Sequence, residues 1–301
     1  MHRRVQLALA GAAASVGLLF LCWLLAFHVG FIARADVSIL NGFIGLGHGR
    51  ERRVAFYIAR LCSPDPYVYL AAVPVVVALL RRRPLVALAV LAVLIGANAT
   101  TELLKPLMAA SRPALPPTGA IPIAAGSWPS GHATAAMSLA LCCVIAAPAR
   151  LRPWVAALGA VFAVAVSYSF LTLAWHYPSD VCAGFLVAMT WTLLAVAALF
   201  AVGGSPEPDA ATRRPRIRLA DALEPPVAAI CAALALAGVV ALARPHAVVE
   251  YVRFHKGFVV GAVVIGALGL VLATSVMLAL GDLSGSGRVP RAALRRRSRP
   301  G

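Results

Sequence analysis

Three short polar stretches between residues 105 and 180 interrupt an otherwise apolar sequence. They cover residues 105–113, 128–132 and 169–180. Each lies at the end of an apolar run long enough to cross a membrane. A charged residue beside lipid costs free energy and is therefore a functional candidate. Two cations, a Ser-Gly turn and two histidines, one with an Asp four residues later, indicate a site that binds and transfers a phosphoryl group.

The first stretch contains two fixed positive charges, Lys105 and Arg112. Phosphoryl transfer needs such charge on the phosphoryl oxygens, together with a nucleophile and a proton for the leaving oxygen. Seven residues would separate the two cations by two helical turns, but Pro106 and Pro113 favour a break in the backbone there. Alternatively, these are membrane-edge cations whose charged ends simply reach water.

The second stretch, Ser130-Gly131-His132, lies immediately before a long apolar run. A serine and the free backbone N–H groups at a helix N-terminus form an anion site. Gly131 allows a ligand to approach the backbone closely. The alternative is that Ser130 only caps the helix.

The third stretch ends in His176 and Asp180, which are four residues apart. On a helix this spacing places both side chains on one face. A carboxylate can hold an imidazole in one tautomer and leave its other nitrogen free to attack phosphorus. The alternative is a capping histidine beside a structural Asp. The joint occurrence of the three stretches, in this order, is more specific than any one of them.

The composition is that of a membrane protein. Hydrophobic residues make up 61% of the 301 residues, and charged residues only 13%. Runs of roughly 20 apolar residues predict membrane helices, so we expect an all-α, polytopic membrane helical bundle. The net charge of +16 could suggest nucleic acid, but the arginines cluster in short segments between apolar runs, which is the positive-inside pattern. No nucleic-acid partner is therefore expected.

The cysteines have no spacing typical of metal or redox sites, and most lie in apolar runs, where cysteine acts as a small hydrophobe. We predict neither a metal site nor a disulfide framework. They are Cys22, Cys62, Cys142, Cys143, Cys182 and Cys231.

Eight spans are expected. The first apolar run is too long for a signal peptide and is predicted to be one retained helix. Residues 34–64 are predicted to form two amphipathic helices at the outer surface, or alternatively a connecting loop. The spans are expected near residues 5–33, 66–80, 85–104, 132–150, 154–174, 180–202, 227–243 and 257–280.

An even number of spans puts both termini on one side. If that side is cytoplasmic, inner segments carry 17 of the 27 basic residues, although the arginines of residues 50–53 oppose this bias. We therefore predict a multi-pass protein of the cytoplasmic membrane, with all three polar stretches on the outer face. The predicted divisions are a core (1–203), a cytoplasmic linker (204–226), two further membrane helices (227–280) and a basic cytoplasmic tail (281–301).

In this order, Lys-x6-Arg-Pro, Pro-Ser-Gly-His and His-x3-Asp resemble the type 2 phosphatidic acid phosphatase (PAP2) superfamily, over roughly residues 35–200. The resemblance implies a six-helix core and hydrolysis without a metal or other cofactor. It implies that His176 is the nucleophile that carries a phosphohistidine and that Asp180 orients it. It further implies that His132 protonates the leaving alkoxide and then activates water. The implied phosphate ligands are Lys105, Arg112, Ser130 and the Gly131 amide.

One position departs from the family pattern. The third motif of the family normally begins Ser-Arg, whereas this chain has Ser169-Phe170, with no Lys or Arg between Arg152 and Arg213. A lost charge-assisted contact is worth about 2–3 kcal/mol, or roughly 30- to 150-fold in rate. The departure implies weak activity, a different substrate, or a cation from elsewhere. The candidates for that cation are Arg253, His255 and Lys256.

The favoured interpretation is a phosphatase that acts on a lipid phosphomonoester or pyrophosphate, with membrane lipids around it. The apolar residues 113–125 could help to admit the lipid tail. One alternative is a phosphoryl or headgroup transferase on a lipid. Another is a non-catalytic protein that binds lipid phosphates. A transporter is disfavoured, because transporters place polar sites near the bilayer midplane. The sequence does not identify the lipid or the oligomeric state.

Overall fold

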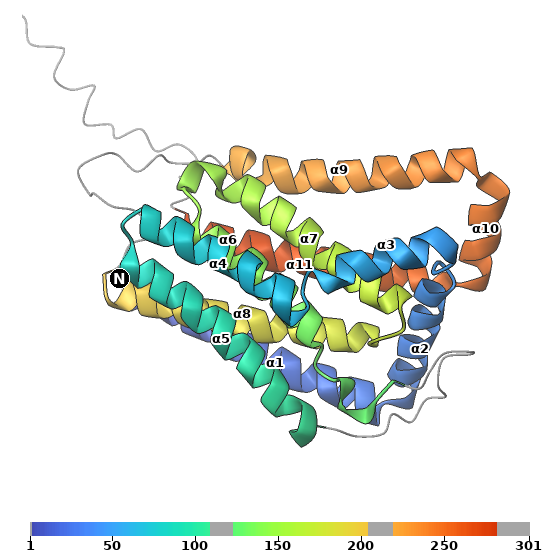
Figure 1. Ribbon diagram of the computed structural model, residues 1–301, viewed down its shortest axis with the longest axis horizontal. Helices are drawn as coiled ribbons and strands as arrows, with labels where there is room; N and C mark the ends of the chain where they lie inside the picture. Colours follow the sequence, from blue (N-terminus) through green and yellow to red (C-terminus); the bar gives the residue numbers. More distant parts are fainter. Residues whose placement is uncertain (1, 109–122, 204–218, 282–301) are drawn as a thin grey trace, which may run out of the picture.

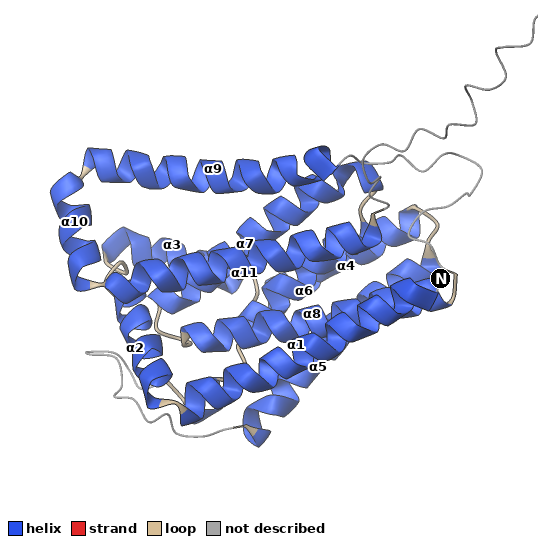
Figure 2. Ribbon diagram, turned by 180° about the vertical axis from the view of Figure 1, so that it is seen from behind, coloured by secondary structure: helices blue, strands red, loops and turns tan. Residues whose placement is uncertain are grey.

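The computed structural model describes residues 2–108, 123–203 and 219–281, and the regular structure of these residues is entirely helical (Figures 1 and 2). Two short 3-10 turns, Ala125–Ser127 and Ala149–Leu151, accompany eleven α-helices in these ranges. The helices are α1 (His2–His28), α2 (Gly30–Ile44), α3 (Gly49–Arg60), α4 (Pro64–Leu80), α5 (Pro84–Leu107), α6 (Gly131–Ala146), α7 (Arg152–Thr172), α8 (Pro178–Ala201), α9 (Leu219–Ala243), α10 (Pro245–Phe254) and α11 (Lys256–Leu280).

The long helices run lengthwise beside one another, while α2 and α10 lie across one end of the bundle (Figure 1). Among the described residues, seven helices are long and apolar enough to cross a membrane. The pair α3 and α4, bent by 54° at a short break, could form an eighth span. The predicted fold class, an all-α polytopic membrane bundle, is confirmed.

The first apolar run forms two helices, so the prediction of one helix over residues 5–33 was wrong. Helix α1 ends at His28, and Val29 is extended (φ −111°, ψ 97°) before α2 begins at Gly30. Glycine is a poor helix former, which favours a break at this point. The break lets α2 turn across the end of the bundle and pack against α7 and α11 (Figure 1).

Two other segments are more helical than expected. Residues 245–254, which lie between the spans predicted near 227–243 and 257–280, form α10. This helix begins with Pro245 in its first turn, where the missing N–H of proline is tolerated. Helix α9 begins at Leu219, inside the predicted linker, and contains Pro225 and Pro226. Residues 34–64 contain most of α2 and all of α3, so helices rather than a connecting loop are confirmed there. Their place at the membrane surface stays a prediction.

Helix α6 lies at the centre of the bundle. In its most apolar stretch 83% of the residues are buried by protein, against 6% for α9, which lies at the periphery. Small residues let the neighbouring helices approach α6 closely, as is usual in membrane bundles. At Gly159 of α7, for example, a Cβ would lie 3.0 Å from the Cβ of Ala140. The site at the beginning of α6 is therefore attached to the most enclosed helix.

Helix α11 packs into the bundle beside α7. A Cβ on Gly261 would overlap Ile39 of α2, and one on Gly269 would lie 3.0 Å from Val164. The hydroxyl of Tyr168 in α7 donates a hydrogen bond to the carbonyl of Ala262. Helix α11 thus supports the two helices that carry residues beside the site, and the division of the chain into a core and two added helices stays a prediction.

Candidate functional site

The described parts of the three polar stretches meet at one end of the bundle, where α5 and α7 end and α6 and α8 begin (Figure 1). The backbone N–H of Ser130 donates to the carbonyl of Asp180 at 3.0 Å, which joins the second stretch to the third. Lys105, in the last turn of α5, lies beside Gly131. Arg112 and residues 113–122 lie outside the described residues. The described parts of the three stretches therefore lie close together, and their common place on the outer face of the membrane stays a prediction.

The rings of His132 and His176 lie close together. Their centroids are 6.3 Å apart, and the ring planes are inclined by 60°. An attacking atom sits about 3 Å from its target, and a general acid about 2.6–3.2 Å from the oxygen that it protonates. The two imidazoles can therefore bracket one phosphoryl group.

The Asp180 carboxylate lies next to Nδ1 of the His176 ring. The His176 Nδ1 is 3.4 Å from the Asp180 Oδ2, and the carboxylate is fully buried. The same oxygen accepts the backbone N–H of Tyr177 at 3.0 Å. Pro178 begins α8, and Asp180 then lies in its first turn, where a negative charge is stabilised by the helix dipole. The carboxylate can thus stabilise charge on the His176 ring and leave Nε2 for chemistry.

A third helix fixes the beginning of α8. The carboxylate of Asp36 in α2 accepts the backbone N–H of Ser179 at 3.0 Å and its hydroxyl at 2.6 Å. Asp36 is buried, with 5% of its surface exposed. Sequence reasoning missed this residue. The available signal was a lone carboxylate in an apolar segment.

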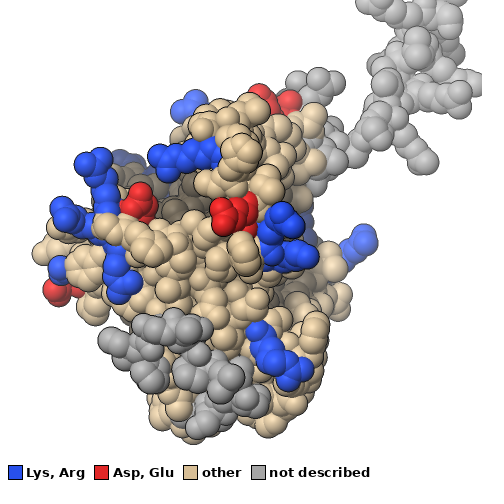
Figure 3. Space-filling view, turned by 90° about the vertical axis from the view of Figure 1, so that its right-hand side faces the viewer, with Lys and Arg blue, Asp and Glu red and all other residues tan. Residues whose placement is uncertain are grey.

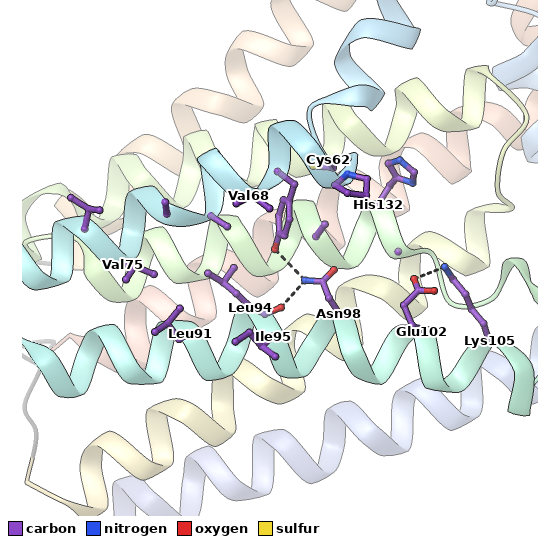
Figure 4. A pocket seen from close by; sticks show the side chains of 17 residues that line it. Cys62, Val68, Val75, Leu91, Leu94, Ile95, Asn98, Glu102, Lys105 and His132 are labelled. Carbon is purple, nitrogen blue, oxygen red and sulfur yellow. Dashed lines mark hydrogen bonds and ion pairs between the residues drawn. The ribbon is translucent and has the colours of Figure 1, made fainter.

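Lys105 is paired with an acid that sequence reasoning also missed. Its Nζ lies 2.6 Å from Oε1 of Glu102, one helical turn earlier. A Cβ on Gly131 would lie 3.3 Å from that carboxylate oxygen and 3.4 Å from the ammonium nitrogen. Both side chains therefore end against the first residue of α6 (Figure 4).

Ser130 caps α6, as the alternative interpretation proposed. Its Oγ accepts the N–H of Ala133 at 3.3 Å, and the residue is fully buried. One turn later the buried hydroxyl of Thr134 lies 3.0 Å from that of Thr101 in α5 and 2.9 Å from the carbonyl of Ser130. These contacts hold the helix that carries Lys105 against the beginning of α6. The role of Ser130 as a phosphate ligand stays a prediction.

An apolar groove leads away from the site. It encloses about 690 Å³ between α4 and α5, and its lining includes Gly131. Lys105 and His132 lie at one end of it (Figure 4). Away from that end its walls are mostly aliphatic, with the Tyr67 hydroxyl and Asn98 joined by a hydrogen bond of 3.2 Å. The aliphatic part includes Val68, Ala71, Ala72, Val75, Leu91, Leu94 and Ile95.

Phe170 occupies the position where the family pattern has Arg. It is fully buried, and its ring lies 5.2 Å from His176 and 6.0 Å from His132. At this position an aromatic ring, rather than a cation, therefore faces both histidines.

The cations proposed as a replacement lie in other surroundings. Arg253 and Lys256 line a separate hollow on α10 and α11. The ring of His255 stacks on Tyr251, with centroids 4.4 Å apart. These positions give the proposed compensation no support.

Arg52 and Arg53 of α3 line a different hollow together with Trp175, whose ring lies 5.5 Å from that of His132. Figure 3 shows Lys and Arg side chains gathered around a hollow at this end of the molecule. Sequence reasoning treated the arginines of residues 50–53 only as evidence on topology. The structure brings this basic segment near the residue that precedes His176.

No group of three or more His, Cys, Asp or Glu side chains within the described ranges is placed to hold a metal ion. The six cysteines are all free thiols.

The fold and the site define a membrane-embedded helical protein in which Lys105 and His132 line the end of an apolar groove, with the His176 ring next to His132 and the buried Asp180 carboxylate next to His176. Residues 86–203 match the family model described as the PAP2 superfamily, and this match is consistent with a membrane protein of that superfamily. The matched range contains every residue named in the three sequence motifs. Comparison with curated proteins and with solved structures gave no match. The family of that model suggests phosphatase-type activity on phosphate esters.

Proposed function

We propose that this protein is a phosphatase that hydrolyses a phosphomonoester or pyrophosphate on a membrane lipid through a phosphohistidine. The observation that carries the proposal is the pair of imidazoles, with ring centroids 6.3 Å apart, of which His132 lies at the polar end of an apolar groove. Each ring has a different task. His176 has a carboxylate behind Nδ1, whereas His132 lines the groove.

In the first step, Nε2 of His176 attacks phosphorus while the bond from phosphorus to the leaving oxygen breaks. Protonated His132 gives its proton to that oxygen, so the alcohol leaves neutral. In the second step, His132 takes a proton from water, and the resulting hydroxide attacks phosphorus. The N–P bond breaks, inorganic phosphate leaves, and both histidines return to their starting forms. No metal or other cofactor is needed for these steps.

Positive charge and helix dipoles would hold the phosphoryl oxygens. Lys105 and the N–H groups at the beginning of α6 converge on one place, since the ammonium nitrogen lies 3.4 Å from the Cβ position of Gly131. Ser130 could donate its hydroxyl proton there, and Arg112 is proposed as a further ligand. Asp180 would stabilise the positive charge on the His176 ring.

The groove supports a lipid substrate. Burying one CH2 group is worth about 0.8 kcal/mol, so an alkyl chain along the aliphatic wall would contribute strongly to binding. Because His132 lies at the polar end of this groove, the lipid would be attached to the leaving oxygen. We further propose that the site opens at the outer face of the cytoplasmic membrane and that both termini are cytoplasmic.

The test is phosphate release by purified protein in detergent without added metal. Phosphatidic acid, phosphatidylglycerol phosphate and a polyprenyl pyrophosphate serve as substrates. We expect release from at least one of them and its loss in His176→Ala, with His246→Ala as a control in the separate hollow. Wild-type release no greater than that of His176→Ala on every substrate would contradict the proposal and favour a non-catalytic lipid-phosphate-binding protein.

A transferase is the second candidate, and the surroundings of the histidines favour it. The rings of Phe170 and Trp175 flank His132, at 6.0 and 5.5 Å, and aromatic side chains restrict the access of water. An alcohol could then attack the same phosphohistidine. Adding a lipid alcohol and detecting its phosphorylated form, with a matching fall in inorganic phosphate, would identify this activity.

A further inference from the structure

The carboxylate of Glu102 lies where a phosphate is expected to bind, and the proposed reaction gives it no task. Its Oε1 is 2.6 Å from the Lys105 ammonium and 3.3 Å from the Cβ position of Gly131. Figure 4 shows the Glu102 and Lys105 side chains meeting at the polar end of the groove. Among the described residues that line this groove, Lys105 is the only Lys or Arg and Glu102 the only acid. A negative charge is thus built into an anion site.

Glu102 stays close to the site even when its flexible side chain turns toward solvent. It is on the same helix as Lys105, three residues earlier, so the backbone keeps it one helical turn away, although 66% of its side chain is exposed, against 27% for Lys105. A phosphate that binds the Lys105 ammonium in place of the carboxylate therefore still has this negative charge nearby. The repulsion between the carboxylate and the bound group then grows with the charge of that group.

The α7 side of the site does not offset this repulsion. The buried ring of Phe170 lies 5.2 Å from His176, where a cation would have balanced an additional negative charge. A phosphomonoester carries a charge of about −1.5 to −2 at pH 7, and a pyrophosphate ester carries more. Among the described residues that line the groove, the pairing of one lysine with one acid therefore suits the anion with the lower negative charge, the phosphomonoester.

We propose that Glu102 is a specificity-determining residue that makes the site prefer a phosphomonoester to a pyrophosphate on the same lipid tail. This inference rests on the proposed phosphatase function and names its substrate class. Arg112 is unchanged between wild type and a Glu102 variant, so the comparison isolates the carboxylate.

The experiment compares farnesyl phosphate with farnesyl diphosphate, which share one tail, at low ionic strength in detergent. We expect wild type to have the higher kcat/KM on the monophosphate. In Glu102→Gln that preference should fall by about tenfold, mainly through KM for the diphosphate, because a nearby charge of this exposure is worth a factor of that order. Glu102→Asp should retain the preference. Glu250→Gln makes the same change of charge in the separate hollow on α10 and should leave the preference unchanged.

An unchanged preference in Glu102→Gln would overturn the inference. This includes an equal loss on both substrates, which would mean that the acid only holds Lys105 in place. If wild type hydrolyses neither substrate and releases no phosphate from the three lipids of the first test, the proposed function fails, and binding then tests Glu102 separately. In that case we expect inorganic phosphate to raise the Tm of wild type more than pyrophosphate does, and Glu102→Gln to reduce or reverse the difference. No difference between the two proteins would overturn the inference in this test as well.

Discussion

At the scale of single residues, His132 and His176 are placed by backbone contacts between two helix beginnings. The Ser130 N–H donates to the carbonyl of Asp180, and Asp180 in turn accepts the N–H of Tyr177. Neither contact depends on the imidazoles themselves. Substituting either histidine should therefore leave the backbone of the site in place. A loss of activity in such a variant would then report the loss of the imidazole and not a change of structure.

Gly131 offers a test of the phosphate position. A methyl group there would lie 3.3 Å from Glu102 and 3.4 Å from Lys105, two flexible side-chain ends that can shift at little cost. It would fill the space in front of the α6 N–H groups, and losing one such donor costs about 10²- to 10³-fold in rate. We expect Gly131→Ala to lower kcat/KM for lipid-phosphate hydrolysis by at least about tenfold while leaving Tm nearly unchanged.

Gly17→Ala is the matched control, because no heavy atom lies within 4 Å of a Cβ there. Full activity in Gly131→Ala would mean that the phosphate does not approach the beginning of α6.

Residue types predicted part of this site and missed the rest for a physical reason. Two histidines and a glycine before a helix are unusual beside lipid, so they stood out. Glu102 precedes Lys105 by three residues, and such pairs are common on ordinary helix surfaces. Only the contact of both side chains with Gly131, which depends on the packing of α5 against α6, distinguishes this pair.

At the scale of elements, the site depends on how closely α8 approaches the beginning of α6. A Cβ on Gly184 of α8 would lie 2.7 Å from the carbonyl oxygen of Ser130 and 3.0 Å from the N–H nitrogen of Thr134. Both are backbone atoms and cannot rotate away. Forcing additional volume into a packed interior costs about 1–3 kcal/mol.

We therefore expect Gly184→Ala to lower both Tm in detergent and activity, unlike Gly131→Ala, which should lower activity alone. Thermal unfolding monitored by circular dichroism provides the measurement. A Tm equal to that of wild type would show that the two helices separate without cost.

The positions of the membrane helices could be predicted from the lengths of the apolar runs. A segment in lipid must satisfy its own backbone hydrogen bonds, so each such run forms a helix. The break at Val29 was not predictable in this way, since residues 5–33 are apolar on both sides of it. It arises because α2 packs across the bundle, where Asp36 binds Ser179 of α8. Tertiary packing therefore decided the position of this break. Helix α10 is a different case, because none of its residues is buried.

At the scale of the whole molecule, burial falls from α6 at the centre to α9 at the edge, and the site lies at the end of the most enclosed helix. The groove between α4 and α5 connects that end with the apolar flank of the bundle. A lipid could thus place its phosphate between the histidines while its tail stays among membrane-spanning helices. This arrangement predicts that the groove affects long-tailed substrates only.

Ala72→Trp tests that prediction, because Ala72 of α4 lines the groove away from the histidines. A bulky ring there should raise KM for a long-chain phosphatidic acid by about tenfold or more, since several buried CH2 groups at about 0.8 kcal/mol each lose their contacts. A water-soluble short-chain phosphate ester should be hydrolysed at the wild-type rate. Ala235→Trp, on an exposed part of α9, adds the same ring outside the groove and should change neither substrate. If Ala72→Trp slowed both substrates equally, the ring would be disturbing the site itself. If it slowed neither, the tail would bind elsewhere, and the groove could not be what selects a lipid.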